Sequence, residues 1–182
     1  MPGLLLQSPT IRDSAIARAG ASDPEAQRWL EWPDKFIVPA SKRERWLSLR
    51  PCAGPLRPSS ADPDVISLVA IDPAAGRIAG MVSMGRKDRD VGGYLVPAYR
   101  GRGLGTVLFA GAAQLAHDHL GIQTVWAGAH PANAASIGAL TAAGFVPVAG
   151  PRTHVQPNGR VIPVRWFGHA REQPGYCGRR RP

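Results

Sequence analysis

The sequence predicts an α/β protein built on a single mixed, mostly antiparallel sheet of about six to seven strands flanked by helices. Three observations lead to this fold class. The length of 182 residues suits one domain with a substantial core. Three apolar segments separated by short turns fill residues 65–96, which indicates consecutive antiparallel strands. From Leu104 onward, segments with helical spacing of apolar residues alternate with further short apolar segments.

Two helices are expected in the N-terminal part. Asp23-Pro24-Glu25 is typical of a helix start, because Asp caps, Pro fits the first turn and Glu complements the positive end of the helix dipole. That helix stops before Pro33. Ser41-Lys42-Arg43-Glu44 has the pattern of a capping box and predicts a second short helix ending near Pro51. Four prolines within residues 51–64 then indicate a loop.

The next three elements are expected to be the strands of a meander, over residues 65–71, 77–84 and 91–96. The first is apolar and rich in β-branched residues, as buried strands are. Only short turn segments separate the three, so each strand should run antiparallel to the one before it.

The remainder of the chain alternates between helices and strands. In order, the expected elements are a helix over 104–120, a strand over 122–129, a helix over 133–142 and strands over 145–148 and 161–166. Gly121 and Gly144 suit the C-terminal ends of the two helices, and Asn133 suits the N-cap of the second. Pro163 predicts that the last strand lies at an edge, because proline cannot donate to an interior ladder.

Composition narrows the class of protein further. With 44% hydrophobic and 19% charged residues, the chain is typical of a globular protein and not of a disordered one. Cys52 and Cys177 are too far apart for a CxxC site and do not indicate a disulfide framework. The sequence contains no apolar run of the roughly 18–20 residues that a membrane span needs. We therefore expect a cytoplasmic protein with no membrane partner.

The net charge of +9 favours a polyanionic ligand, either a nucleic acid or a phosphorylated cofactor. Part of this charge is local, since the segment from Arg171 to the end carries four arginines and one glutamate. Residues 169–182 have little apolar surface to bury, so we expect a mobile basic tail.

The most informative segment runs from Val96 to Thr106, where an expected strand leads through a glycine-rich basic loop into a helix. Free backbone amides and the positive dipole end make such a helix start an anion site, for which a pyrophosphate is well suited. The P-loop pattern is absent because no Gly-Lys pair follows. The dinucleotide pattern GxGxxG fails as well, because Thr106 stands where its third glycine would be.

The spacing Arg100-x-x-Gly103-x-Gly105 instead resembles the acetyl-CoA pyrophosphate loop of the GNAT superfamily of N-acetyltransferases. Asn133 with Ser136, followed by Gly144-Phe145, is similar to the second cofactor helix of that family. The resemblance covers about residues 65–168. It implies acetyl-CoA as co-substrate, and the residues expected to contact it are Leu95, Val96, Arg100, Gly101, Arg102, Gly103, Leu104, Gly105, Thr106 and Asn133.

The resemblance also implies a division of labour within a single domain over residues 1–168. Residues 1–64 would form a helical substrate-side part, and residues 65–168 the cofactor-binding core. The segment from Ser22 to Leu30, together with Ser136, is similar to the branch that acetylates ribosomal-protein N-termini.

In the family that this chain resembles, an amine attacks acetyl-CoA directly in a ternary complex. A backbone N–H on the strand before the loop stabilises the oxyanion, which here would be that of Leu95 or Val96. The sequence departs from the family in two places. Leu140 stands where many members carry a general-acid Tyr, and Gly128 where others carry a Glu.

Two residues remain as catalytic candidates. Ser136 matches a Ser proposed in the ribosomal branch to assist the thiolate. The alternative is that Ser136 only caps its helix. His130, three residues before Asn133, has a titration range that suits proton removal from an amine, but it is also placed to pack or cap there. His117 and His119 are expected on the surface, and no metal site is expected because no histidines have metal-ligand spacing with acidic partners.

The remaining side chains near the site are expected mainly to pack. Tyr94, next to the oxyanion position, is expected to pack rather than to contact substrate. Trp29, Trp32 and Trp46 either line the acceptor pocket or pack, and their helical spacing favours the core for Trp29 and Trp46.

The expected function is transfer of an acetyl group to a primary amine, on a small molecule, a protein N-terminus or a lysine. One alternative is a binding module that keeps the fold without catalysis, as the missing Tyr and Glu would allow. Another is a nucleic-acid-binding protein, which the scattered distribution of the basic residues disfavours. The expected edge strand over 161–166 leaves pairing into a homodimer open.

Overall fold

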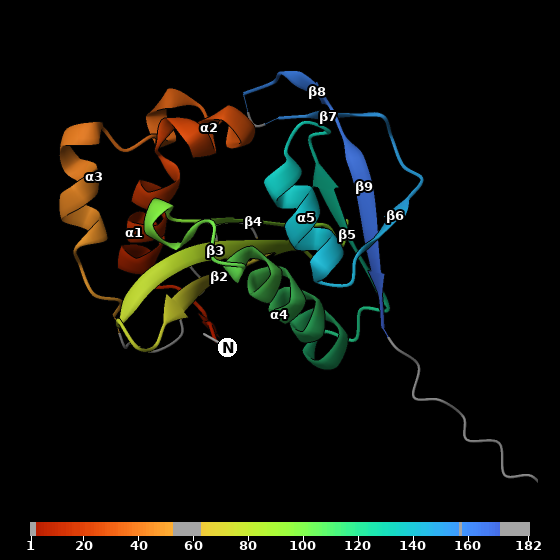
Figure 1. Ribbon diagram of the computed structural model, residues 1–182, viewed down its shortest axis with the longest axis horizontal. Helices are drawn as coiled ribbons and strands as arrows, with labels where there is room; N and C mark the ends of the chain where they lie inside the picture. Colours follow the sequence, from red (N-terminus) through yellow and green to blue (C-terminus); the bar gives the residue numbers. More distant parts are fainter. Residues whose placement is uncertain (1–2, 53–62, 157, 172–182) are drawn as a thin grey trace, which may run out of the picture.

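The computed structural model describes residues 3–52, 63–156 and 158–171. In chain order these form β1 (Leu5–Gln7), α1 (Ile11–Ala21), α2 (Pro24–Leu30), the short 3-10 helix η1 (Asp34–Phe36), α3 (Ala40–Leu47), β2 (Val65–Asp72), β3 (Arg77–Gly85), β4 (Val91–Leu95), η2 (Pro97–Tyr99), α4 (Leu104–His119), β5 (Thr124–Ala129), α5 (Ala134–Ala142), β6 (Val146–Val148), β7 (Thr153–Val155), β8 (Val161–Pro163) and β9 (Arg165–Ala170) (Figure 1).

The strands form two antiparallel sheets and one separate hairpin. One sheet has the order β1-β2-β3-β4 and the other has the order β5-β9-β6, while β7 and β8 form a two-stranded sheet of their own. The two sheets meet where Asp90 and Trp126 form a parallel bridge, next to a hydrogen bond from the Trp126 N–H to the Arg89 carbonyl (2.8 Å). The α/β class with mainly antiparallel strands is confirmed. The expected single sheet is divided, because β4 and β5 diverge beyond this bridge.

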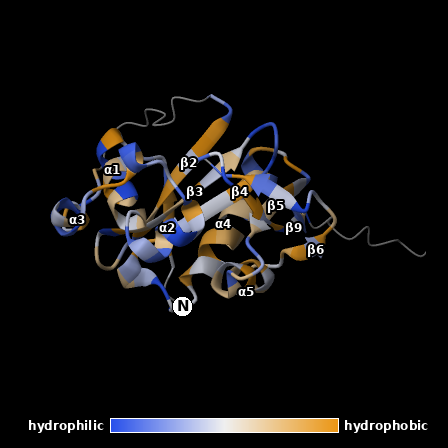
Figure 2. Cartoon of the chain, turned by 90° about the horizontal axis from the view of Figure 1, so that it is seen from above, coloured by the Kyte–Doolittle hydropathy of each residue, from blue (hydrophilic) through white to orange (hydrophobic). Residues whose placement is uncertain are grey.

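Helices cover both faces of the larger sheet. Residues along β2 alternate between faces, so that Leu68 and Ala70 join a core with α4 and α5, whereas Val69 and Ile71 pack against α1. Hydrophobic colours on β2 and α4 mark this packing in Figure 2. No helix within the described ranges is both long and apolar enough to cross a bilayer.

The last turn of α1 packs very closely on the end of β4. A Cβ built on Gly20 would lie 2.1 Å from Cγ1 and 2.8 Å from Cβ of Val96. Only a residue without a side chain allows this approach, which fixes α1 beside the segment that leads into the glycine-rich loop.

Several expected elements need correction at the N-terminal end. Neither β1 nor α1 is expected from the sequence. The helix expected at Ser41 begins at Ala40 after Pro39, and no side-chain cap is found there, so the capping box from Ser41 to Glu44 does not form. Most of the loop expected over residues 51–64 lies outside the described residues.

The C-terminal strands also differ from expectation. The single edge strand expected over 161–166 is two strands, because β8 pairs with β7 while β9 lies between β5 and β6. β9 continues to Ala170, and the Arg171 N–H donates to the Gln123 carbonyl (2.8 Å). The expected tail therefore does not begin at residue 169, and residues 172–182 lie outside the described part.

Candidate functional site

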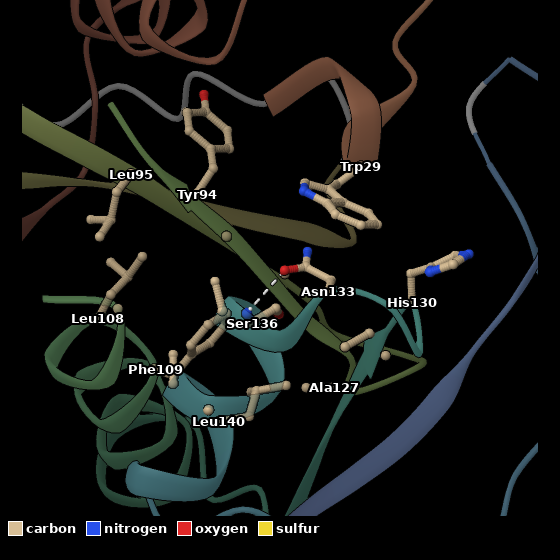
Figure 3. A pocket seen from close by; sticks show the side chains of 18 of the residues that line it. Trp29, Tyr94, Leu95, Leu108, Phe109, Ala127, His130, Asn133, Ser136 and Leu140 are labelled. Atoms are coloured by element: carbon tan, nitrogen blue, oxygen red, sulfur yellow. Dashed lines mark hydrogen bonds between the residues drawn. The ribbon is translucent and has the colours of Figure 1, made fainter. Parts of the chain in front are cut away.

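A cavity of about 910 Å³ lies where β4 and β5 diverge. Five parts of the chain line it: α2, β4, the loop from Arg100 into α4, the end of β5 with the start of α5, and the β7–β8 hairpin with β9. Figure 3 shows Trp29 of α2 above His130, with an apolar floor beneath. The volume falls in the range typical of small-molecule sites.

One end of the cavity is suited to an anion. Gly101 and Gly103 adopt left-handed φ values of +70° and +73°, which let the loop turn into the first turn of α4. The amides of residues 101–105 donate no hydrogen bond to any described residue, as expected for a helix N-terminus. Since a Cβ on Gly103 would meet no atom within 4 Å, the loop backbone is open to a ligand.

Gly105 has a different structural role from Gly101 and Gly103. It lies within α4, where a Cβ would approach the Cβ of Ala139 in α5 to 3.1 Å. Its small size therefore serves helix packing, and α4 and α5 can meet closely beneath the cavity.

The two arginines of the loop do not act as the sequence suggested. The Nε–H of Arg100 donates to the Leu95 carbonyl (3.0 Å), and its two terminal nitrogens donate to the two carboxylate oxygens of Asp23 (2.8 and 2.6 Å). Arg100 thus lines the cavity but directs most of its donors to protein groups. Arg102 is exposed, lies over the Tyr99 ring at 5.8 Å and is not among the lining residues.

The end of β4 distinguishes the two expected oxyanion donors. The Val96 N–H donates to the Ala79 carbonyl of β3 (2.9 Å), and Val96 is only 3% exposed. Val96 therefore has no amide to offer to a ligand, which corrects its expected role. Because hydrogen-bonding direction alternates along an antiparallel strand, the N–H and C=O of Leu95 face away from β3, toward the gap before β5.

The floor of the cavity is apolar. Leu108 and Phe109 of α4 and Leu140 of α5 line it, and Leu140 is 1% exposed (Figure 3). At Gly128 on β5, an added Cβ would lie 2.9 Å from Cγ2 of Val164. The positions where the family carries Tyr or Glu are thus a buried leucine and a glycine without room for a larger side chain.

His130 lies in the turn between β5 and α5, at the cavity wall. Its ring centroid is 5.5 Å from that of Trp29, so Trp29 lines the cavity and is not a core residue as expected. The Ala132 N–H donates to Nδ1 of His130 (3.1 Å), which places the proton of the neutral ring on Nε2. A proton taken up by His130 would have to displace this hydrogen bond.

Ser136 and Asn133 form the start of α5. The Asn133 side-chain oxygen accepts a hydrogen bond from the Ser136 N–H (3.1 Å), drawn as a dashed line in Figure 3. The cap of α5 is thus Asn133, not Ser136. The Ser136 hydroxyl lines the cavity and forms no hydrogen bond with the described residues.

Tyr94 points to the α1 side of the sheet, away from Leu108 and Ser136 (Figure 3). Its hydroxyl donates to the Met81 sulfur (3.4 Å), and its ring meets that of Trp32 edge-on at 5.6 Å. Burial raises the pKa of Tyr94 far above its ordinary value, so the phenol stays neutral. Tyr94 packs as expected, as does Trp46, which lies against the Ile16 cluster.

The sequence did not indicate the part that the β7–β8 hairpin plays in the cavity. His154, Gln156 and Ile162 of this region line the wall near Trp166. Nothing in the local sequence marks them, because they reach the site only through pairing of segments distant in the chain.

Among the other histidines, His119 is exposed as expected, but His117 is only 5% exposed. His117 contacts His169 through its Nε2 (2.9 Å) and donates from Nδ1 to the Ile122 carbonyl (2.6 Å). His117 is therefore a buried packing residue. Within the described ranges, no group of His, Cys, Asp or Glu is arranged to hold a metal ion.

Comparison with known proteins identifies the family of this fold. A family model described as an acetyltransferase (GNAT) domain matches residues 3–146. No curated protein matches the chain.

Solved structures give the same fold at low sequence identity. An acetyltransferase of the GNAT family from Bacillus anthracis is 10% identical over 92% of this chain and 95% of its own, with a TM-score of 0.68. A structure described as a ribosomal-protein-serine acetyltransferase from Vibrio cholerae is 13% identical over 94% and 95%, with a TM-score of 0.65. AAC(6')-Ib in complex with paromomycin and acetyl-CoA is 18% identical over 93% and 94%, with a TM-score of 0.65.

Proposed function

Because the chain belongs to the GNAT acetyltransferase family, we propose that it transfers an acetyl group from acetyl-CoA to a primary amine by direct attack within a ternary complex. The observation that carries this proposal is the continuity of one cavity. It joins the open amides at the start of α4, the outward-facing side of Leu95 and an aromatic wall that includes Trp29. Such a cavity suits a phosphorylated donor at one end and an acceptor at the other.

The cofactor contacts follow from the backbone. We assign the pyrophosphate to the amides of the segment 101–105, where the helix dipole adds to the attraction. Leu104, Gly105 and Thr106 then lie along the ligand at the start of α4, and Asn133 holds α5 in place on the opposite side. Arg102 remains available near the loop, although it is directed over Tyr99.

The Leu95 N–H is assigned to the oxygen that becomes negative when the amine attacks the thioester carbonyl. A fixed donor at this point stabilises the developing charge more than water does, because it needs no reorganisation. The C–N bond forms as an electron pair of the carbonyl moves to the oxygen, and the amine proton leaves to a base. When this oxyanion collapses back to a carbonyl, the C–S bond breaks and the departing thiolate gains a proton or a hydrogen bond.

His130 and Ser136 are assigned to these two proton steps. His130 would accept the amine proton, which requires its ring to exchange the Ala132 hydrogen bond for that proton. Ser136 would hydrogen-bond the leaving thiolate, since its hydroxyl lines the cavity and the cap of α5 comes from Asn133.

A screen of amine acceptors with acetyl-CoA, read by free thiol release, tests the proposal. The related structures suggest its panel: an aminoglycoside such as paromomycin, peptides beginning with the N-terminal sequences of ribosomal proteins, and a lysine peptide. We expect thiol release that depends on both acceptor and enzyme. Tight binding of acetyl-CoA with no turnover on any amine would instead favour the binding module, and the absence of binding would overturn the proposal.

A further inference from the structure

We propose that Asp23 and Arg100 are positioning residues that hold the end of β4 so that the Leu95 amide meets the reacting carbonyl. This inference rests on the proposed function. It also gives Arg100 a role other than that of a pyrophosphate ligand.

Most N–H groups of the Arg100 guanidinium donate hydrogen bonds to other groups of the protein. Besides its bonds to Leu95 and Asp23, it donates to Oε2 of Glu25 (3.3 Å), so four of its five N–H groups have partners. The side chains of Arg100 and Asp23 are 23% and 16% exposed, which limits screening of the pair by water.

Asp23 is held as firmly as its partner. Besides binding Arg100, its Oδ1 accepts hydrogen bonds from the backbone N–H groups of Glu25 (3.2 Å) and Ala26 (3.3 Å). Asp23 thereby caps α2. Burial alone would raise the pKa of Asp23, but the hydrogen bonds from Arg100 and the α2 amides outweigh this effect and lower the pKa. The carboxylate therefore stays charged at neutral pH.

The hydrogen bond to Leu95 connects the Asp23–Arg100 ion pair to the proposed reaction. Val96 is the last β4-side residue bonded to β3, and β5 has already diverged from the strand at this point. Among the described residues, no neighbouring strand thus orients the outward-facing groups of Leu95. Arg100 supplies the missing support by binding the Leu95 carbonyl, which faces the same side as the Leu95 N–H.

The same ion pair ties the acceptor side to the donor side. α2 carries Trp29, which walls the cavity, and its first turn is fixed to Arg100. Its other end is fixed to the hairpin region, because Glu31 pairs with Arg160 (2.8 Å) and accepts from Asn158 (3.3 Å). Figure 1 shows α2 lying between α1 and the β7–β8 hairpin.

Two variants separate positioning from ligand binding. Asp23→Asn weakens the ion pair but keeps the cap, since Asn caps helices as well as Asp does. Arg100→Gln removes the guanidinium. Each is assayed with acetyl-CoA and with S-acetylpantetheine, a donor that lacks the pyrophosphate. A positioning role predicts that kcat falls about tenfold or more with both donors, because small misplacements at the reacting centre have large effects on rate.

The binding constants complete the test. The Kd of acetyl-CoA should stay within about threefold of wild type, and the double variant should be no slower than Arg100→Gln, as for residues that act as one unit. Glu31→Gln is the matched control, because it breaks the ion pair at the other end of α2 and should leave kcat with S-acetylpantetheine within about twofold of wild type. A defect seen only with acetyl-CoA, together with a raised Kd, would assign Arg100 to the pyrophosphate and overturn the inference.

Infrared spectroscopy of bound [1-¹³C]acetyl-CoA supplies a readout that needs no acceptor. We expect wild type to shift the thioester carbonyl stretch to lower wavenumber, and both variants to lose most of that shift while still binding the ligand. An unchanged shift in the variants contradicts positioning by Arg100. If wild type does not bind acetyl-CoA at all, the proposed function fails, which is a distinct outcome.

Discussion

The Asp23 carboxylate combines a helix cap with an ion pair, and the pH dependence of its contribution follows from its pKa. That pKa is lowered in the folded protein, so the folded state binds this proton less readily than the unfolded chain does. The resulting stabilisation is fully present above the ordinary Asp pKa of about 3.9. It is lost as the pH falls through the lower, folded-state value.

Asp23→Asn should therefore destabilise the protein by about 1–2 kcal/mol at pH 7, the scale of hydrogen bonds to charged groups. The difference from wild type should shrink toward zero once the pH falls below the lowered pKa of folded Asp23, where the wild-type residue also loses its charge. Urea unfolding at pH 7 and at such an acidic pH measures this. Asp34→Asn, at an exposed position of η1, is the control and should have little effect at either pH. If the difference in unfolding free energy between Asp23→Asn and wild type did not change with pH, the charge of Asp23 would not contribute to stability.

Substitution of the two catalytic candidates, His130 and Ser136, should lower turnover with different pH dependences. His130→Ala should lower turnover by about 10²-fold if His130 is the base, and the defect should shrink at high pH, where free amine is abundant. Ser136→Ala should lower turnover with no such rescue, since alkali does not protonate a leaving thiolate. Both variants should bind acetyl-CoA normally. Full activity in both variants would mean that neither side chain takes part in the chemistry. The mechanism would then consist of oxyanion stabilisation by the Leu95 amide and of approximation of the reactants.

Single-residue roles were predictable from the sequence only where the signal is local. Asn133 was predicted as an N-cap and is one, because a cap depends on residues three positions apart. The ion pair of Arg100 was not predictable, because its partner Asp23 lies 77 positions away. Trp29 was assigned to the core from helical spacing, but the apolar face of α2 lines a cavity rather than a solid core.

At the scale of elements, the contact between α1 and β4 makes a prediction about packing. Gly20→Ala should destabilise the protein by about 1–3 kcal/mol, because the new methyl would overlap Val96 near its backbone. Gly138→Ala in α5 is the matched control. A Cβ there meets nothing within 4 Å, so the better helix former should stabilise by about 0.5–1 kcal/mol. Thermal or urea unfolding distinguishes the two, and equal effects would contradict the close approach.

Elements were predictable where their own sequence marks both ends. α5 is bounded by Asn133 and by Gly144 with φ of +89°, and its expected and observed limits agree closely. α1 escaped prediction because its buried face consists largely of small residues, which give weak periodicity. The strand expected over 161–166 was wrong because the chain leaves one partner for another within it, which only the tertiary fold determines.

For the whole molecule, binding of acetyl-CoA should increase the free energy of unfolding. Acetyl-CoA at about 100 times its Kd should add about 2.7 kcal/mol and raise the thermal midpoint. Dephospho-CoA, which lacks the ribose 3'-phosphate, and pantetheine derivatives, which lack the pyrophosphate as well, should raise it less, because each offers fewer anionic groups to the protein. Differential scanning fluorimetry over a concentration series measures the effect. No shift at millimolar acetyl-CoA would contradict the acetyl-CoA site.

The divergence of β4 from β5 also leaves a sheet edge inside the molecule. Gly93 and Leu95 direct backbone groups into the gap, where no strand of the described part of the chain pairs with them. Edges of this kind attract strands of other chains when they are exposed, but here α2 and the β7–β8 hairpin wall the gap. We therefore expect the ion pairs at the two ends of α2, which fix this wall, to limit self-association. A chain carrying Arg100→Gln and Glu31→Gln together should aggregate on mild heating before its helices and strands are lost.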